Sequence, residues 1–274
     1  MLFGAIRYDP NQGMNDQRQP YLEIIDPTMP SVVTTLELDK SVMNASTDST
    51  VDISMGSGAG HEAGSLTGGG GIPFVSDPSR GIISVDIYLY YPNSRGGERF
   101  EAYIFVMDIE DMLTKVPSPS GPNRRYIEWK DFRSSAAMFS YHSVGEDRYR
   151  ILSRHSYASE FRYASPIQPL VPEDPKGPRC FFVYDFNPNR EASDFLPAAA
   201  EDTHPEMDYP RSAREITREV IGGLTCWRMR FDLPAAEEDV QGCHVALTDG
   251  GVVLFEVRYL LSRSLGWFSA YIFC

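Results

Sequence analysis

The sequence is short of positive charge, and this shortage limits the kinds of partner that it can bind. Its 274 residues include 25 Lys and Arg against 38 Asp and Glu, which gives a formal net charge of −13. Nucleic acids and anionic membranes are bound by concentrated basic surfaces. The basic pair Arg124-Arg125 is interpreted as part of a solvated turn. We therefore predict neither a nucleic-acid partner nor a membrane partner.

Cysteine is also scarce, and its spacing forms no Cys-x-x-Cys motif. The four cysteines are Cys180, Cys226, Cys243 and Cys274. The chain shows no signal-peptide pattern and no run of about 18 apolar residues. These features predict a reducing compartment, either cytoplasmic or nuclear. The sequon Asn44-Ala45-Ser46 is accordingly expected to be ordinary loop sequence.

Motifs that would indicate a metal site or a catalytic site are missing as well. The five histidines have no second ligand at metal-binding spacing; they are His61, His142, His155, His204 and His244. His155, Ser156 and Glu160 are residue types of a nucleophile site, but adjacency in sequence is not the spatial geometry of a triad. We assign no catalytic, cofactor-binding or metal-binding residue, and we predict no cofactor.

Two other patterns resemble functional motifs without their usual context. Gly56-Ser57-Gly58-Ala59-Gly60 has neither a strand before it nor a helix after it, so a flexible linker is the better interpretation than a phosphate loop. The acidic pairs Glu201-Asp202 and Glu237-Glu238-Asp239 lie in loops rich in Pro and Ala. They are expected to be solvated surface rather than a glycosidase pair.

The chain is instead rich in aromatic strands and in turn residues, with 15 Phe, 15 Tyr, 20 Pro and 22 Gly. The run from Arg179 to Phe186 has β-branched and aromatic residues at successive positions in its middle and stops at Asn187-Pro188, which predicts a strand buried on both faces. Residues 82–91 and 99–106 predict a hairpin, followed by a short helix over 109–116. Asp249-Gly250, between the apolar runs 243–248 and 251–257, predicts a second hairpin. Further strands are predicted over residues 2–8, 21–25, 32–38, 126–132, 136–141, 149–152 and 220–232.

These patterns predict an all-β fold, an incomplete or irregular β-propeller-like (WD-repeat-like) array of antiparallel hairpins with a long disordered insertion. Residues 1–38 would supply the first strands, and 39–71 a disordered insertion rich in Ser and Gly. Residues 72–257 would form the main propeller-like region. The tail 258–274 follows a hairpin that looks complete and lacks clean periodicity, so we interpret it as an atypical tail, a possible gene-model artefact.

Aromatic side chains are the remaining candidates for a binding surface. Most are expected to pack between strands, and a minority could line a face that grips a peptide. The candidates are Tyr88, Tyr90, Tyr91, Tyr103, Phe105, Trp129 and Trp227.

Three segments together carry a resemblance to a known family: Ile72–Arg80 before a long strand, Tyr126–Phe132, and Val183–Pro188 with its Asp-Phe-Asn-Pro element. Their order resembles the C-terminal propeller-like region of basidiomycete fungal F-box proteins. The resemblance implies the substrate-binding region of a ubiquitin-ligase receptor. The F-box that docks such receptors on the ligase adaptor does not precede Leu2 here, so an adaptor is expected as a partner only if an F-box lies upstream, with Met1 as an internal methionine.

The leading hypothesis is a non-enzymatic protein-interaction module with an unidentified protein partner. The alternative is a β-propeller enzyme or carbohydrate-binding protein that uses carboxylates and aromatics on one face. Propellers host both functions. Three or more convergent Asp, Glu, Arg or His side chains in a central pocket would favour the alternative. A flat aromatic and charged face without perturbed carboxylates would favour the interaction module.

Overall fold

The computed structural model describes much of the chain as β-strands. The described residues are 21–26, 29–38, 50–57, 81–92, 98–115, 125–142, 158–159, 161–165, 167–171, 177–192, 213–233, 235, 240–248, 251–259 and 266–273. They form mostly antiparallel sheets with few helices, which confirms the all-β prediction at that level. No closed sheet and no propeller sheet occurs among them. No helix in these ranges is long and apolar enough to cross a membrane.

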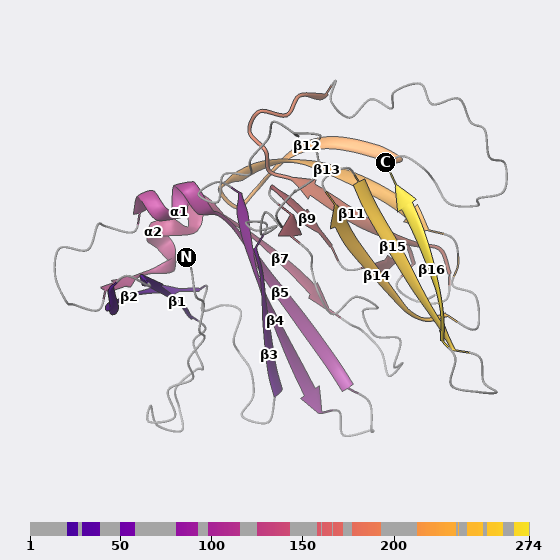
Figure 1. The fold of residues 1–274 in the computed structure, drawn as a ribbon, viewed down its shortest axis with the longest axis horizontal. Helices are drawn as coiled ribbons and strands as arrows, with labels where there is room; N and C mark the ends of the chain where they lie inside the picture. The colour runs from indigo at the N-terminus through magenta and orange to yellow at the C-terminus, as the bar shows by residue number, and fades with distance from the viewer. Residues whose placement is uncertain are drawn as a thin grey trace, which may run out of the picture. The chain divides into compact units, whose positions relative to one another are not determined.

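The chain divides into two compact units whose segments alternate along the sequence. The first contains Met1–Met55, Val85–Glu146 and Gly222–Leu224, and the second contains Gly56–Ser84, Asp147–Ile221 and Thr225–Cys274. Figure 1 labels most of the described strands and colours them by residue number.

A four-stranded sheet with the order β3-β4-β5-β7 is the larger sheet of the first unit. Its strands are β3 (Thr50–Ser57), β4 (Ile82–Pro92), β5 (Glu98–Asp108) and β7 (Ala136–His142). The predicted strands over 82–91, 99–106 and 136–141 are confirmed, and β4 and β5 are neighbours as expected of a hairpin. The register sets Ile104 opposite Phe139 in the antiparallel pair β5 and β7. Both side chains are buried, so this pair belongs to the core of the unit.

Strand β3 corrects the prediction of a continuous disordered insertion over residues 39–71. Val51, Ile53 and Met55 alternate with polar residues along β3, which is the period of a strand with one apolar side. The surrounding Ser- and Gly-rich composition hid this alternation. The rest of the predicted insertion lies outside the described residues.

A smaller sheet in the first unit joins β1 (Tyr21–Asp26), β2 (Met29–Glu37) and β6 (Arg125–Ile127). The two opening strands confirm the predictions over 21–25 and 32–38, and they pair antiparallel. Strand β6 pairs parallel to β2. The predicted strand over 2–8 lies outside the described residues, as does the one over 149–152.

The helix α1 (Ile109–Lys115) confirms the predicted short helix, and its start has a local cause. The side chain of Asp108 accepts a hydrogen bond of 2.8 Å from the backbone N–H of Asp111, which caps the first turn. Lys115 at the other end donates to the hydroxyls of Ser134 and Ser135, which belong to the 3₁₀ helix η2 (Arg133–Ser135). These bonds anchor α1 to η2.

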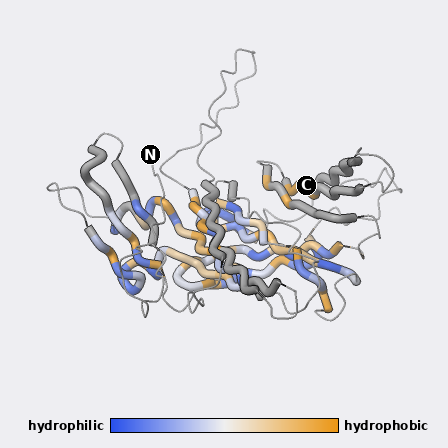
Figure 2. Tube along the Cα trace, turned by 90° about the horizontal axis from the view of Figure 1, so that it is seen from below, coloured by the Kyte–Doolittle hydropathy of each residue, from blue (hydrophilic) through white to orange (hydrophobic). Residues whose placement is uncertain are grey.

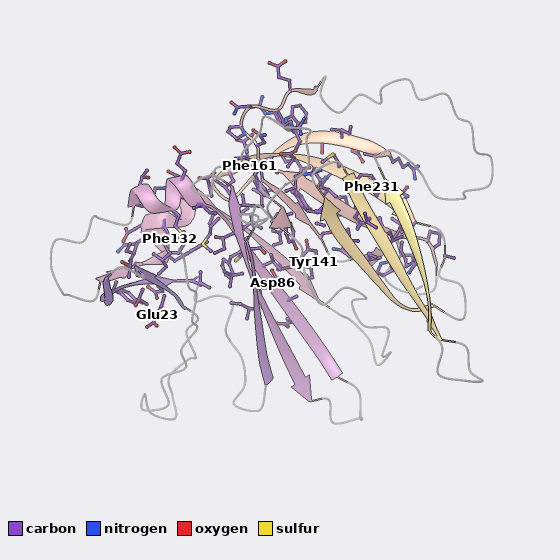
Figure 3. The ribbon with its side chains drawn as sticks, viewed as in Figure 1. Glu23, Asp86, Phe132, Tyr141, Phe161 and Phe231 are labelled. Carbon is purple, nitrogen blue, oxygen red and sulfur yellow. The ribbon has the colours of Figure 1, made fainter. Side chains whose placement is uncertain are left out.

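The predicted strand over 126–132 is only half correct, because Trp129–Phe132 forms the helix α2. Trp129 meets Phe132 edge-on at 5.0 Å between ring centroids and Phe105 edge-on at 5.5 Å. Phe132, labelled in Figure 3, is buried. Aromatic packing against strand β5 therefore outweighs the strand preference of these residues.

Gly222 and Gly223 are required by close backbone approach in the first unit. Gly222 has a φ of +60°, and Gly223 donates a backbone hydrogen bond of 3.1 Å to the carbonyl of Ala136. A Cβ at Gly222 would overlap this carbonyl, and one at Gly223 would overlap the backbone of Ser134. A side chain at either position would therefore force the backbone to move.

The larger sheet of the second unit has the order β12-β13-β11-β9-β8, with β10 also paired to β11. Its strands are β8 (Ala158–Ser159), β9 (Arg162–Ala164), β10 (Gln168–Pro169), β11 (Arg179–Asp185), β12 (Glu215–Ile221) and β13 (Leu224–Leu233). Six of the seven residues of β11 are buried, which confirms the strand predicted to be buried on both faces. The prediction over 220–232 missed β12 and the turn that separates it from β13.

The second sheet of this unit contains β14 (Val240–Thr248), β15 (Gly251–Tyr259) and β16 (Gly266–Phe273). Thr248 pairs with Gly251, so the predicted hairpin is confirmed, although residues 249 and 250 lie outside the described ranges. Strand β16 pairs antiparallel with β15 from Val252 to Tyr259. Residues 266–273 of the tail thus form a third strand of this sheet, a strand that the sequence analysis did not predict.

The core of the second unit lies where these two sheets contribute buried apolar side chains. Its members are Ala164, Ile167, Phe181, Val183, Phe231, Leu233, Val245, Val252 and Leu254. The rings of Phe181 and Phe231 stack at 5.0 Å with planes 7° apart; Phe231 is labelled in Figure 3. Where the strands are coloured, Figure 2 shows hydrophobic and hydrophilic residues interspersed along them, as expected where strand faces differ in polarity.

Candidate functional site

Strand β11 has two chemically different faces, and the face away from Phe181 carries the candidate site. Residues paired across antiparallel strands lie on the same face of a sheet. Phe181 pairs with Phe231 and therefore shares the core face. On the opposite face the register gives three further pairs: Cys180 with Asp232, Phe182 with Arg230, and Tyr184 with Arg228.

Arg228 is held at the centre of this second face by two neighbours. One guanidinium nitrogen lies 2.9 Å from a carboxylate oxygen of Glu219, and the guanidinium carbon lies 5.2 Å from the centroid of the Phe182 ring. The side chains of Arg228 and Glu219 are 29% and 30% exposed, so the ion pair is partly shielded from water. A guanidinium over an aromatic face is stabilised by the ring quadrupole. The arginine is therefore oriented while part of it stays accessible.

Tyr184 extends the aromatic part of this face. Its ring centroid lies 6.2 Å from that of Phe182 and 6.0 Å from that of Tyr163, with which it stacks. Burial raises the pKa of the Tyr184 phenol, so this tyrosine is neutral over the physiological range. We call the surface formed by Phe182, Tyr184, Glu219, Arg228, Arg230 and Asp232 the arginine-aromatic face.

The carboxylate of Asp232 is bound by two arginines at one end of this face. Arg230 Nε lies 2.7 Å from one carboxylate oxygen, and Arg214 binds the other. Burial raises the pKa of Asp232, but the hydrogen bonds from Arg214 and Arg230 outweigh it, so the net pKa lies below its ordinary value. Asp232 is thus ionised at neutral pH and has no proton to give as a general acid.

The two described cysteines of the sheet are poorly suited to nucleophilic chemistry. Cys180 and Cys226 are buried free thiols. Burial raises the pKa of both, and the pKa of Cys226 reaches about 12, with the charge of Glu219 adding to the effect of burial. A thiol needs to lose its proton to act as a nucleophile. Both therefore behave as small buried side chains of the sheet.

The Asp-Phe-Asn-Pro element forms a self-bonded turn at the end of β11. Asp185 accepts a hydrogen bond of 2.9 Å from the backbone N–H of Asn187, and Asn187 accepts one of 3.0 Å from Asn189. Both are side-chain bonds to the backbone two residues on, which favour a turn. The indole N–H of Trp227 donates 3.1 Å to the carbonyl of Arg190 and holds the end of the turn against β13. This structural role accounts for the residues of the element.

None of the candidate residues named in the sequence analysis belongs to this face. His142 and His244 lie in β7 and β14, and Gly56 and Ser57 end β3. Phe105 is buried as a packing residue, as predicted, and Trp227 lies in β13. The remaining candidates for chemistry lie outside the described ranges: His61, His155, Ser156, Gly58–Gly60, Glu160, Glu201, Asp202, His204 and Glu237–Asp239. Within the described ranges, no three His, Cys, Asp or Glu side chains gather in a way that could hold a metal ion.

Sequence reasoning missed the arginines of this face, although a signal for them was present. From Cys226 to Asp232 every second residue of β13 is Cys, Arg, Arg and Asp, while the residues between them are Trp, Met and Phe. This alternation marks one polar and one apolar side of the strand. The alternation does not predict which side chains contact each arginine.

Comparisons with known proteins identify no relative: no family model, no curated protein and no solved structure matches the chain.

Proposed function

We propose that the protein is a non-enzymatic protein-interaction module that binds a protein partner through the arginine-aromatic face. The observation that carries the proposal is the placement of Arg228 between Glu219 and the Phe182 ring. Arginine and aromatic side chains are enriched at the centres of protein interfaces. An arginine already held in place loses less conformational entropy on binding than a mobile one.

Asp232 of the face and the nearby thiol of Cys226 support a binding role over a catalytic one. The carboxylate of Asp232 is held in its ionised form by Arg214 and Arg230, and the pKa of Cys226 is raised to about 12. Both shifts move the group away from the protonation state that acid or nucleophilic catalysis needs. No specific observation favours the alternative of an enzyme or carbohydrate-binding protein.

The resemblance to fungal F-box proteins extends this proposal to a cellular role. In that interpretation the sheets are parts of an open, propeller-like array, and the module is the target-binding part of a ubiquitin-ligase receptor in the cytoplasm or nucleus. Docking on the ligase adaptor would be carried by an F-box encoded upstream of Met1. Sequencing the transcript across this locus tests that part of the proposal.

A capture experiment with matched arginine variants tests the interaction face. The tagged full chain serves as bait in a native extract, beside Arg228→Ala and the control Arg133→Ala, which removes an exposed arginine of the first unit. Proteins retained by the wild type and the control but lost on Arg228→Ala are then purified, and their affinities are measured. We expect Arg228→Ala to weaken binding by about tenfold to a hundredfold, as for an interface hot spot.

A second variant separates loss of the surface from loss of folding. Arg228→Lys keeps the charge but cannot reproduce the planar contact with the Phe182 ring, so it should also weaken binding while the circular dichroism spectrum stays native. Equal retention of every captured protein by wild type and Arg228→Ala would refute the proposal.

A further inference from the structure

Strand β12 forms one edge of the larger sheet in the second unit. Among the described strands, β13 is its neighbour on one side, and the strand order of the sheet ends at β12 (Figure 1). An edge strand presents backbone N–H and C=O groups that can pair with an additional strand. Extended peptides bind other proteins by adding to such an edge.

The charges of β12 oppose pairing with a second copy of the same strand. A two-fold symmetric antiparallel pair centred on Thr217 would set Glu215 opposite Glu219. A pair centred on Arg218 would set this arginine opposite Arg218 of the second copy. A pair centred on Glu219 would likewise set the two copies of Glu219 opposite each other. Like charges directly opposite each other destabilise a strand pair. These three registers are therefore disfavoured, while a strand with the complementary charge meets no such repulsion.

Arg218 is the cation on this edge that would meet such a strand. Its guanidinium carbon lies 5.9 Å from the centroid of the Trp227 ring, and no carboxylate of the described residues lies within ion-pair distance of it. Arg218 is exposed, and Val220, two residues on, is 71% exposed. Ile216, Arg218 and Val220 lie on one face of the strand because side chains alternate. This face of β12 therefore presents an apolar, a basic and an apolar side chain in turn.

We propose that the outer edge of β12 binds an extended segment of a partner protein as an added β-strand. The segment has an acidic residue opposite Arg218 and apolar residues two positions to either side, opposite Ile216 and Val220. On the other face, basic residues on both sides of the acid meet Thr217 and Glu219. The pattern is symmetric, so it fits β12 in either direction. This proposal rests on the proposed function, since it specifies the kind of partner that the module takes.

Two labelled peptides and two charge variants test the pairing. The first peptide has the core Val-Lys-Glu-Lys-Val, and the second has Lys in place of the central Glu. Binding to the full chain is measured by fluorescence anisotropy for the wild type, Arg218→Glu and the control Arg133→Glu. We expect the wild type and the control to bind the Glu peptide with about tenfold higher affinity than the Lys peptide. Arg218→Glu should reverse this preference, because residue 218 then repels the central Glu and attracts the central Lys.

Hydrogen exchange locates the bound peptide. The Glu peptide should slow exchange of the β12 amides and leave the β16 amides unchanged. Absence of binding, absence of the reversal with Arg218→Glu, or protection confined to other strands would each overturn the proposal. The capture experiment reports separately on the arginine-aromatic face, so a partner lost on Arg228→Ala but retained on Arg218→Glu would leave the proposed function standing and refute the edge.

Discussion

Replacing Phe181 by alanine should remove a large part of the stability of the second unit. The side chain is 0% exposed and its ring stacks on Phe231 at 5.0 Å. Truncating a buried phenylalanine to alanine costs about 3–5 kcal/mol, and a stacked aromatic pair contributes about 0.5–1.5 kcal/mol beyond its buried area. We therefore expect a loss of about 4 kcal/mol, against a typical total of about 5–15 kcal/mol for a folded domain.

The adjacent residue offers a matched control, because Phe182 lies on the other face of the same strand. Phe182 is partly exposed, so Phe182→Ala should cost clearly less, about 1–2 kcal/mol. Urea denaturation followed by circular dichroism gives both free energies of unfolding. Phe181→Leu should recover most of the loss because it refills most of the volume. Equal costs for Phe181→Ala and Phe182→Ala would refute the assignment of the two faces of β11.

Two further predictions follow from pKa shifts on the other face. The pKa of Cys226 is raised from 9.0 to about 12, mainly by burial, so alkylation of this thiol at about pH 8 should be about a thousandfold slower in the native than in the unfolded chain. Peptide mass spectrometry measures the two alkylation rates. A difference below tenfold would contradict the prediction. The pKa of Asp232 is lowered in the folded state, so its contribution to stability is present above its unfolded pKa of 3.8 and is lost as pH falls through the folded pKa. Below about pH 4, the free energy of unfolding should therefore decrease less steeply with falling pH for Asp232→Asn than for the wild type. Identical dependence on pH for the two proteins would count against the contacts of Asp232 with Arg214 and Arg230.

The elements predicted correctly are those whose signal is local. Residues 243–257 combine two apolar runs with an Asp-Gly pair, and β14 and β15 pair with the register that a two-residue turn requires. The apolar run from Arg179 to Phe186 needs no partner to be recognised as a buried strand. The helix over 109–116 follows a strand that ends at Asp108, a residue able to cap it.

The elements that were missed depend on context that a local window does not contain. Val51, Ile53 and Met55 alternate correctly for a strand, but they lie inside a long segment of Ser, Thr and Gly that favours disorder. Trp129 and Phe132 have high strand preference, yet packing on Phe105 makes their segment helical. In both cases the structural neighbour, strand β4 for β3 and Phe105 for Trp129, lies far away in the sequence.

The arginine-aromatic face could not be derived from the sequence because it depends on a long-range pairing. Phe182 and Arg228 are brought together by the antiparallel register of β11 and β13, strands that are separated along the chain by β12 and a long connection. Shifting this register by one residue would place Arg228 on the core face with Phe181 and leave Phe231 outside. The register is therefore fixed by burial of the apolar side, and the arrangement of charge on the opposite side is a consequence of that burial. A substitution that weakens the core stack should for this reason also disorder the face that we propose binds the partner.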